Sequence, residues 1–469
     1  MTEENVSLYA DWKKIYPRYQ TGFFRTLRWS LVVLFLGIYY LLPFLRWQRE
    51  AGLPDQAVLF DLPGRKFYLF DLVVWPQEIF LLAILLIAAA LGLFFITALA
   101  GRVFCGYMCF QTVWTDLFLY IEKIFEGNRK QRIKLDTSGW TFRKLILKLG
   151  KHGVWLLIGV ATGGAFVFYF ADAPTLFRQF LDGSAPAPAW FTLLFFTGTT
   201  YVMAGIAREQ VCIYMCPYAR FQGAMFDEDT IIISYHPELG EPRESNRRIR
   251  EAKKGSIGLC IDCNACVTVC PTGIDIRDGQ QYECITCGAC IDACNTVKDR
   301  LHLKNELIRY TSMREMKGGE TQWFRPRILI YGGLLTLFLG GISAFFAFRS
   351  PVELNVIRHR QPIYIMQSDG GIQNNFTIRV LNMSPNPRTF SIEVENLKGS
   401  SLTVGAIKKV DEKNRPLLTV SPGDVMPFTV YVKQAKNHLQ SGAQEIRFQL
   451  RALDNAEHFD TYNSVFMRP

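Results

Sequence analysis

No cysteine follows Cys294 in this chain, although its 469 residues include twelve cysteines, of which the first is Cys105. A secreted protein stabilised by disulfide bonds would carry cysteines throughout its exported part. The sequence therefore argues against a disulfide framework. It indicates instead thiols in a reducing compartment, where grouped cysteines more often bind metal than form disulfides.

Sequence signatures of several enzyme classes are also missing. There is no Walker loop, no dinucleotide-binding glycine fingerprint and no nucleophile elbow. The six histidines are scattered without an HxxxH pair, and His236 is only a weak functional candidate. No cleavable signal peptide is evident, because the first apolar run follows a long polar stretch without an A-x-A site.

The net charge of +10 is not concentrated in one basic stripe with interleaved aromatic residues. Many Lys and Arg residues instead flank apolar runs. This pattern is typical of membrane proteins, whose cytoplasmic loops carry an excess of basic residues. We therefore expect no nucleic-acid partner.

Long apolar runs dominate the first half of the chain. Hydrophobic residues make up 49% of the sequence and charged residues 20%, which suggests membrane spans joined to polar domains. A helix needs about 20 mainly apolar residues to cross a bilayer. Five stretches meet this requirement: 27–45, 78–101, 152–171, 190–208 and 327–348. The sequence thus predicts a five-span α-helical bundle, with four spans in 27–208.

Basic residues also predict the orientation of the spans. Several precede the first span, and the 102–151 stretch holds ten Lys or Arg against four acidic residues. The loop at 172–189 holds a single basic residue. Segments 1–26 and 209–326 should therefore be cytoplasmic, and 349–469 should be periplasmic. Every cysteine then lies on or near the reducing side.

The segment 349–469 has a different pattern from the rest of the chain. Apolar residues alternate with polar ones in short runs, such as Phe376, Ile378 and Val380, or Ile446, Phe448 and Leu450. Turn-forming sequences rich in Pro, Gly, Ser and Asn separate these runs. A period of two with such turns predicts a small C-terminal β-sandwich.

The strongest motif is a pair of four-cysteine runs within 209–326. The first run, C-x2-C-x2-C-x3-C-P, consists of Cys260, Cys263, Cys266 and Cys270, and the second of Cys284, Cys287, Cys290 and Cys294. This spacing is typical of bacterial ferredoxins with two [4Fe–4S] clusters, in which the fourth cysteine of each run binds the other cluster. Zinc also uses CxxC pairs, but rarely two four-cysteine runs.

The spacing therefore predicts a ferredoxin-like insert with two [4Fe–4S] clusters. The expected ligands of one cluster are Cys260, Cys263, Cys266 and Cys294. The expected ligands of the other cluster are Cys284, Cys287, Cys290 and Cys270.

A second cysteine motif, C-x-Y-M-C, occurs twice. It joins Cys105 to Cys109 just after the second span, and Cys212 to Cys216 just after the fourth. If each motif is helical, its two cysteines share a face, and the two pairs could offer four thiolates at one membrane depth. Thiolate and thioether select Cu(I), zinc or iron–sulfur iron, so Met108 and Met215 are possible extra ligands. The alternative is that these cysteines are small buried apolar residues.

These motifs together resemble the FixG/CcoG/RdxA proteins, accessory proteins of cbb-type cytochrome oxidase assembly. The resemblance covers nearly the whole chain. It rests on Arg102-Val103-Phe104-Cys105-Gly106-Tyr107, on the segment from Cys212 to Gln222, on Gly240-Glu241-Pro242-Arg243, and on the eight-cysteine run with Pro271-Thr272-Gly273. Two residues depart from the expected pattern. His236 stands where an Asp is expected in relatives, and Phe110 follows the first membrane motif where Pro217 follows the second.

The resemblance implies a cupric reductase of the bacterial inner membrane, with a periplasmic immunoglobulin-like domain at its C-terminus. Cys105, Cys109, Cys212 and Cys216 stand at the family's proposed copper positions. Expected partners are membrane lipid, copper chaperones or oxidase assembly factors, and an electron donor of unknown identity; a homodimer is possible. Two alternatives are a quinol-linked electron-transfer subunit and a non-enzymatic assembly scaffold.

Overall fold

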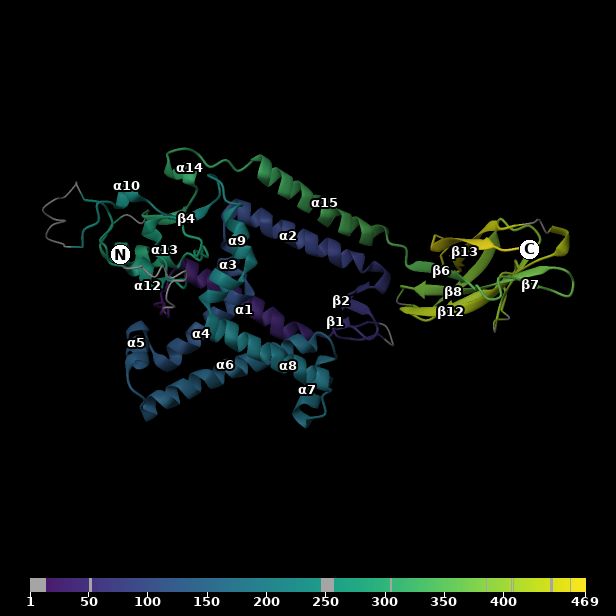
Figure 1. Ribbon diagram of the computed structural model, residues 1–469, viewed down its shortest axis with the longest axis horizontal. Helices are drawn as coiled ribbons and strands as arrows, with labels where there is room; N and C mark the ends of the chain where they lie inside the picture. The colour runs from purple at the N-terminus through teal and green to yellow at the C-terminus, as the bar shows by residue number, and fades with distance from the viewer. Residues whose placement is uncertain are drawn as a thin grey trace, which may run out of the picture. The chain divides into compact units, whose positions relative to one another are not determined.

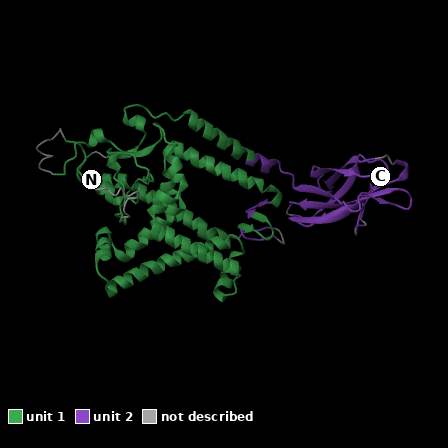
Figure 2. Cartoon of the chain, viewed as in Figure 1, with its two compact units in different colours: residues 1–45, 57–67, 75–341 green, residues 46–56, 68–74, 342–469 purple. Residues whose placement is uncertain are grey.

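The computed structural model describes residues 14–49, 53–245, 257–303, 306–384, 386–405, 407, 409–438, 442–455 and 457–469. The first thirteen residues of the predicted cytoplasmic segment, and Pro385 in a predicted turn, lie outside these ranges. The chain forms two compact units (Figure 2). Unit 1 comprises residues 1–45, 57–67 and 75–341, and unit 2 comprises residues 46–56, 68–74 and 342–469.

Five helices are long and apolar enough to cross a membrane, as predicted. They are α1 (Phe23–Leu41, continued by η1, Leu42–Phe44), α2 (Phe80–Ala100, preceded by η2, Pro76–Glu78), α6 (Phe142–Phe168), α8 (Ala187–Thr200, continued by the π-helix η3, Tyr201–Ala207) and α15 (Pro326–Phe348). Within unit 1, α6 lies along α8 and also contacts α4 (Figure 1).

Helix α6 begins at Phe142, well before the span predicted at 152–171. The Thr141 hydroxyl accepts a hydrogen bond from the Lys144 backbone N–H at 3.2 Å and so caps the helix. Lys148 and Lys151 lie in the polar first part of the helix, where their ammonium groups bind carboxylates. A search for apolar runs cannot detect this part, because its lysines lower the local hydropathy.

Further elements connect the first four spans, and of these β3 and the second half of β2 belong to unit 2. They are β1 (Val58–Asp61), β2 (Lys66–Leu69), β3 (Leu72–Val74), α3 (Val103–Tyr107), α4 (Phe110–Glu126), α5 (Arg129–Thr137) and α7 (Ala173–Asp182). The insert between the fourth and fifth spans contains η4 (Val211–Met215), α9 (Pro217–Gly223), β4 (Ile232–Tyr235), α10 (Pro237–Gly240), α12 (Ala265–Val269), η5 (Ile276–Asp278), α13 (Ala289–Arg300), β5 (Ile308–Thr311) and α14 (Met313–Met316). Strands β4 and β5 pair antiparallel, with Ile232 opposite Thr311, and so hold the two ends of the insert together.

Unit 2 contains the predicted β-sandwich. One sheet has the order β10-β12-β8-β6, with β7 also paired to β8, and the other has the order β11-β9-β13-β14. The strands are β6 (Val352–Arg358), β7 (Ile365–Met366), β8 (Ile372–Asn382), β9 (Arg388–Glu395), β10 (Ser400–Val404), β11 (Leu417–Val420), β12 (Asp424–Gln434), β13 (Gln444–Ala452) and β14 (Phe459–Phe466); η6 (Lys436–His438) follows β12. The rings of Phe376 and Phe448 meet edge to face in the core, 5.0 Å apart.

A buried group of charged side chains links α4 to its neighbours in unit 1. Glu122 and Glu126 on α4 have fully buried side chains. Glu122 lies 3.1 Å from the Arg132 guanidinium and 3.0 Å from that of Arg208. Glu126 lies 2.7 Å from the Lys151 ammonium. These ion pairs hold α4 against α5, α6 and the chain that leaves the fourth span.

The cations around Glu122 keep its carboxylate ionised. Burial by itself raises the pKa of Glu122, but Arg208, Lys151 and Arg132 outweigh it and lower the pKa to about 2. The ordinary pKa of this side chain is 4.5, so Glu122 binds fewer protons in the folded protein than in the unfolded one at intermediate pH. Its contribution to stability is therefore present above pH 4.5 and is lost as the pH falls toward 2.

We predict that Glu122→Gln destabilises unit 1 by about 3–5 kcal/mol, because it leaves buried cations without their counter-charge. The thermal midpoint of the detergent-solubilised protein should fall at pH 7. It should also depend less on pH between 4.5 and 2 than the wild-type midpoint. The control is Glu228→Gln, which removes an exposed carboxylate paired with Lys317 and should leave the midpoint unchanged. Equal midpoints for Glu122→Gln and wild type would contradict the role given to this group.

Candidate redox site

The two cysteine runs of the insert share one backbone pattern. In the first run, Asp262 and Asn264 flank Cys263 with φ of 49° and 55°. In the second, Thr286 and Gly288 flank Cys287 with φ of 54° and 76°. Left-handed residues on both sides of the middle cysteine bend each loop strongly before a helix begins. Non-glycine residues adopt this conformation at a cost and mainly at functional sites, so the repeat indicates two loops built to curl around a group.

Each loop lines a cavity together with cysteines from elsewhere in the insert. One cavity is lined by Cys260, Cys263, Cys266 and Cys294. The second is lined by Cys270, Cys284, Cys287 and Cys290, and also by Cys266. The fourth cysteine of each run thus lies with the first three of the other run. The packing of α12 against α13 produces this exchange.

Burial makes several of these thiols poor acids. It raises the pKa of Cys266 and of Cys284 to about 12, and that of Cys294 to about 11. The neighbouring thiols shift each pKa in the same direction. Such thiols lose their protons when a metal centre supplies positive charge. Two cavities, each lined by four or more cysteines, therefore fit two [4Fe–4S] clusters, whose iron atoms are each bound by one cysteine.

The membrane motifs differ from the prediction that each cysteine pair shares one helical face. Helix α3 ends at Tyr107, and Cys109 is extended, with φ −60° and ψ 126°. In the second motif, η4 ends at Met215 and Cys216 is extended, with φ −79° and ψ 113°. The prediction of a continuous helix is therefore wrong in both motifs.

A common turn explains where the helices stop. The Cys109 N–H donates to the Phe104 carbonyl at 2.9 Å, and the Cys216 N–H donates to the Val211 carbonyl at 2.8 Å. Both bonds span five residues and close a π-turn, a common ending for a helix. Each second cysteine then precedes a new helix, α4 or α9. Pro217 suits the first position of α9, whereas Phe110 takes that position in α4.

The structure nevertheless brings the membrane thiols into one neighbourhood. Burial raises the pKa of Cys105 and Cys109, and raises that of Cys212 to about 12. The pKa of Cys212 is further raised by the nearby thiols of Cys109, Cys105 and Cys216. Met108 and Met215 have exposed fractions of 45% and 59%. Among the described residues, no group of three or more His, Cys, Asp or Glu is arranged to hold a single metal ion.

The first membrane motif packs directly on the second cysteine loop of the insert. Cys105 forms a buried apolar cluster with Ile285 and Cys287. A Cβ atom added to Gly106 would lie 2.6 Å from the Ile285 carbonyl oxygen and 3.1 Å from the Cys287 Cα. The Tyr107 hydroxyl donates to the Cys287 carbonyl at 3.2 Å. Only a glycine after Cys105 allows the two backbones to approach so closely.

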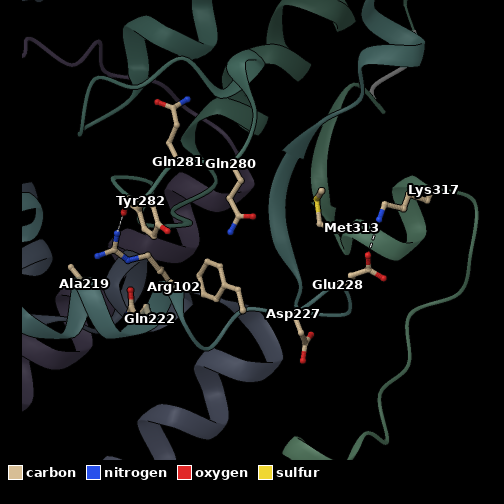
Figure 3. A pocket seen from close by; sticks show the side chains of 12 residues that line it. Arg102, Ala219, Gln222, Asp227, Glu228, Gln280, Gln281, Tyr282, Met313 and Lys317 are labelled. Carbon is tan, nitrogen blue, oxygen red and sulfur yellow. Dashed lines mark hydrogen bonds and ion pairs between the residues drawn. The ribbon is translucent and has the colours of Figure 1, made fainter.

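Two side chains to which the sequence alone assigns no role lie beside this contact. Arg102 and Gln222 are buried and line a cavity of about 430 Å³ between α9, the 280–282 loop and α14 (Figure 3). The Gln222 amide donates to the Cys105 Sγ at 3.4 Å. Gln222 had one signal in the sequence, its place in the segment that follows Cys216.

Arg102 and Arg208, which precede the two membrane motifs, have different surroundings. Arg102 donates through Nη1 to the Tyr282 carbonyl, next to the second cysteine loop of the insert. Arg208 binds Glu122 instead. Arg208 also adopts φ 45° and ψ −115°, close to the φ 57° and ψ −129° of Gly101. The repeated part is therefore the backbone, whereas the arginine side chains are not equivalent.

Known protein families match three parts of the chain. Residues 207–313 match a 4Fe–4S dicluster domain, and residues 82–130 match a 4Fe–4S binding domain. The second match includes the first membrane motif. Residues 342–469 match the domain described as an Ig-like fold at the C-terminus of FixG.

Known relatives match almost the entire chain. The nitrogen fixation protein FixG of Rhizobium meliloti is 41% identical over 98% of this chain and 94% of its own length. Protein RdxB of Cereibacter sphaeroides is 43% identical over 98% of this chain and 97% of its own. The chain belongs to the FixG family. Protein RdxA of Cereibacter sphaeroides is 46% identical over 84% of each chain.

A crystal structure of a FixG-related protein from Vibrio parahaemolyticus covers 25% of this FixG-family chain and 96% of that chain, with 21% identity and a TM-score of 0.22. The family matches and the five apolar helices make this an iron–sulfur membrane redox protein. The predicted family and fold class are confirmed.

We predict that Gly106→Ala forces the first membrane motif away from the insert, because the added Cβ overlaps the Ile285 carbonyl. Overpacking of this kind costs about 1–3 kcal/mol. The thermal midpoint should fall, and Cys105 should react faster with a maleimide. Gly139→Ala is the control, since a Cβ there meets nothing within 4 Å. Unchanged midpoint and labelling rate in Gly106→Ala would show that the contact is absent in solution.

Proposed function

We propose that the protein is a cupric reductase, in which two [4Fe–4S] clusters supply electrons to copper held by the membrane cysteines. The observation that supports this most directly is the packing of Cys105 and Gly106 against the Ile285–Cys287 loop. A thiol group that can bind a soft metal ion thereby lies against a loop that can bind a cluster. This arrangement suits one-electron transfer between two centres.

The proposed ligands follow the two cavities of the insert. Cys260, Cys263, Cys266 and Cys294 bind the distal cluster. Cys270, Cys284, Cys287 and Cys290 bind the proximal cluster, the one next to Cys105. Cys266 lines both cavities, which supports a short path between the clusters.

Copper is the substrate, and the proposed binding residues are Cys105, Cys109, Cys212 and Cys216. Each turnover oxidises one reduced cluster by one electron and reduces one Cu(II) to Cu(I). Soft thiolates favour Cu(I) over Cu(II) and so raise the copper potential. Met108 and Met215 are further proposed ligands, which would have to turn from their exposed positions. A one-electron reductant, for which dithionite substitutes in vitro, recharges the clusters.

The basic loops support an orientation with the clusters on the cytoplasmic side of a bacterial inner membrane. The C-terminal sandwich would then be periplasmic. Such a protein fits a role in copper delivery to a cbb-type oxidase, with copper chaperones or assembly factors as partners. Fusing a reporter active only in the periplasm to the C-terminus tests this orientation.

We predict that Cys270→Ala removes the proximal cluster alone. Purified protein should keep roughly half of its iron and acid-labile sulfide, because only one of the two clusters loses a ligand. Electron paramagnetic resonance (EPR) of the dithionite-reduced protein should show one cluster instead of two interacting ones. Cys294→Ala is the matched variant and should remove the distal cluster instead. If Cys270→Ala removed the distal cluster, or removed both clusters, the ligand assignment would be wrong.

We predict that changing Cys105, Cys109, Cys212 and Cys216 together to Ser abolishes copper binding and reduction. Pre-reduced wild-type protein, freed of dithionite, should convert Cu(II) to Cu(I), measured with a Cu(I)-specific chelator. The variant should keep its iron content, which is the control for folding, but lose the activity.

Four outcomes would contradict the copper proposal. Full reduction by the four-serine variant would place copper elsewhere. Iron in place of copper at these cysteines would make them an iron–sulfur site. Rapid cluster oxidation by a quinone analogue without copper would favour the quinol-linked subunit, and normal oxidase assembly by a redox-inactive variant would favour the scaffold.

A further inference from the structure

Arg102 is a buried cation beside the first membrane motif. Its exposed fraction is 4%, and its Nη1 donates to the Tyr282 carbonyl oxygen. Its Nε atom is buried and has no hydrogen-bond partner among the residues that the structure describes. Within the part of the chain that the structure describes, no carboxylate lies within ion-pair distance of Arg102. A buried charge is costly unless an opposite charge lies nearby, so Arg102 requires a counter-charge of another kind.

The other charged groups around the cavity have partners of their own. Glu228 and Lys317 form an ion pair of 2.7 Å at the mouth (Figure 3). Asp227 lies 3.1 Å from the Arg325 guanidinium. Arg102 thus differs from the other charged groups that line this cavity, because no carboxylate among the described residues neutralises its charge.

Arg102 lies between the segments that carry the cysteines of the two redox centres. Arg102 directly precedes α3, which carries Cys105. Its hydrogen-bond partner Tyr282 lies close in sequence to Cys284. Burial raises the pKa of Cys105, Cys109, Cys212 and Cys284, and in each case the Arg102 charge acts in the opposite direction. One guanidinium therefore acts on three membrane cysteines and on one cysteine of the insert.

We propose that Arg102 is the shared counter-cation of the two redox centres. This inference rests on the proposed function. Its first part concerns the proximal cluster, where reduction adds one negative charge that a nearby cation stabilises. Its second part concerns copper, because a Cu(I) ion bound by two or more thiolates also carries net negative charge. Arg102 is a positioning residue that raises the potential of both centres.

The test is a redox titration of the copper-free protein, followed by EPR, in wild type and in Arg102→Gln. The midpoint potential of the proximal cluster should shift to a lower value in the variant, while that of the distal cluster stays unchanged. Arg102→Lys keeps the charge and should show a smaller shift. Lys317→Gln removes a paired, exposed cation of the same cavity and should shift neither cluster.

A second variant covers the case in which Arg102→Gln fails to assemble its clusters. Gln222→Glu preserves the side-chain shape and places a carboxylate in the same cavity as Arg102, so it should also lower the proximal potential. Unchanged potentials in both variants, or an equal shift of both clusters, would overturn the proposal.

Copper is measured separately, so that the two proposals can fail independently. The Cu(I) affinity of Arg102→Gln, determined by competition with a chromogenic chelator, should be lower than that of wild type. If wild type binds no copper, the cupric reductase proposal fails, whereas the cluster titration still decides the role of Arg102. If copper binds equally well to both proteins, the copper half of the inference is wrong.

Discussion

The close approach of Gly106 to the Ile285–Cys287 loop is the constraint on which the redox site depends. Backbone atoms of a membrane motif and a cluster-binding loop can meet only because residue 106 has no side chain. The Tyr107 hydroxyl adds a hydrogen bond to the same loop. The contact makes the proximal cavity, rather than the distal one, the neighbour of the membrane thiols.

Charge is distributed around this contact in two different ways. Glu122 and its cations balance one another in a buried group that holds the helices in place. Among the described residues, no carboxylate pairs with Arg102, whose charge acts instead on cysteines of both centres. The two arginines that precede the membrane motifs thus have different roles. Arg208 supports the packing of the helices, and Arg102 tunes the redox potentials. The duplicated backbone provides equivalent turns, and the side chains before them make the two halves unequal.

Much of this architecture could be predicted from the sequence. Apolar length predicted the five spans, and a period of two predicted the sandwich. The spacing of the eight insert cysteines predicted which four would lie together. The helix break at Cys109 could not be predicted, because a π-turn has no distinct residue signal. The roles of Arg102, Gln222 and Glu122 depend on tertiary contacts between segments far apart in the sequence.

The most direct test of the central claim is an experimental structure of the cluster-loaded protein in a lipid environment, with both iron clusters located. The cluster bound by Cys270, Cys284, Cys287 and Cys290 should lie nearer to Cys105 than the other cluster, and Gly106 should contact the Ile285–Cys287 loop. A structure in which the other cluster faces the membrane cysteines, or in which the insert stands apart from Gly106, would contradict the proposed electron path.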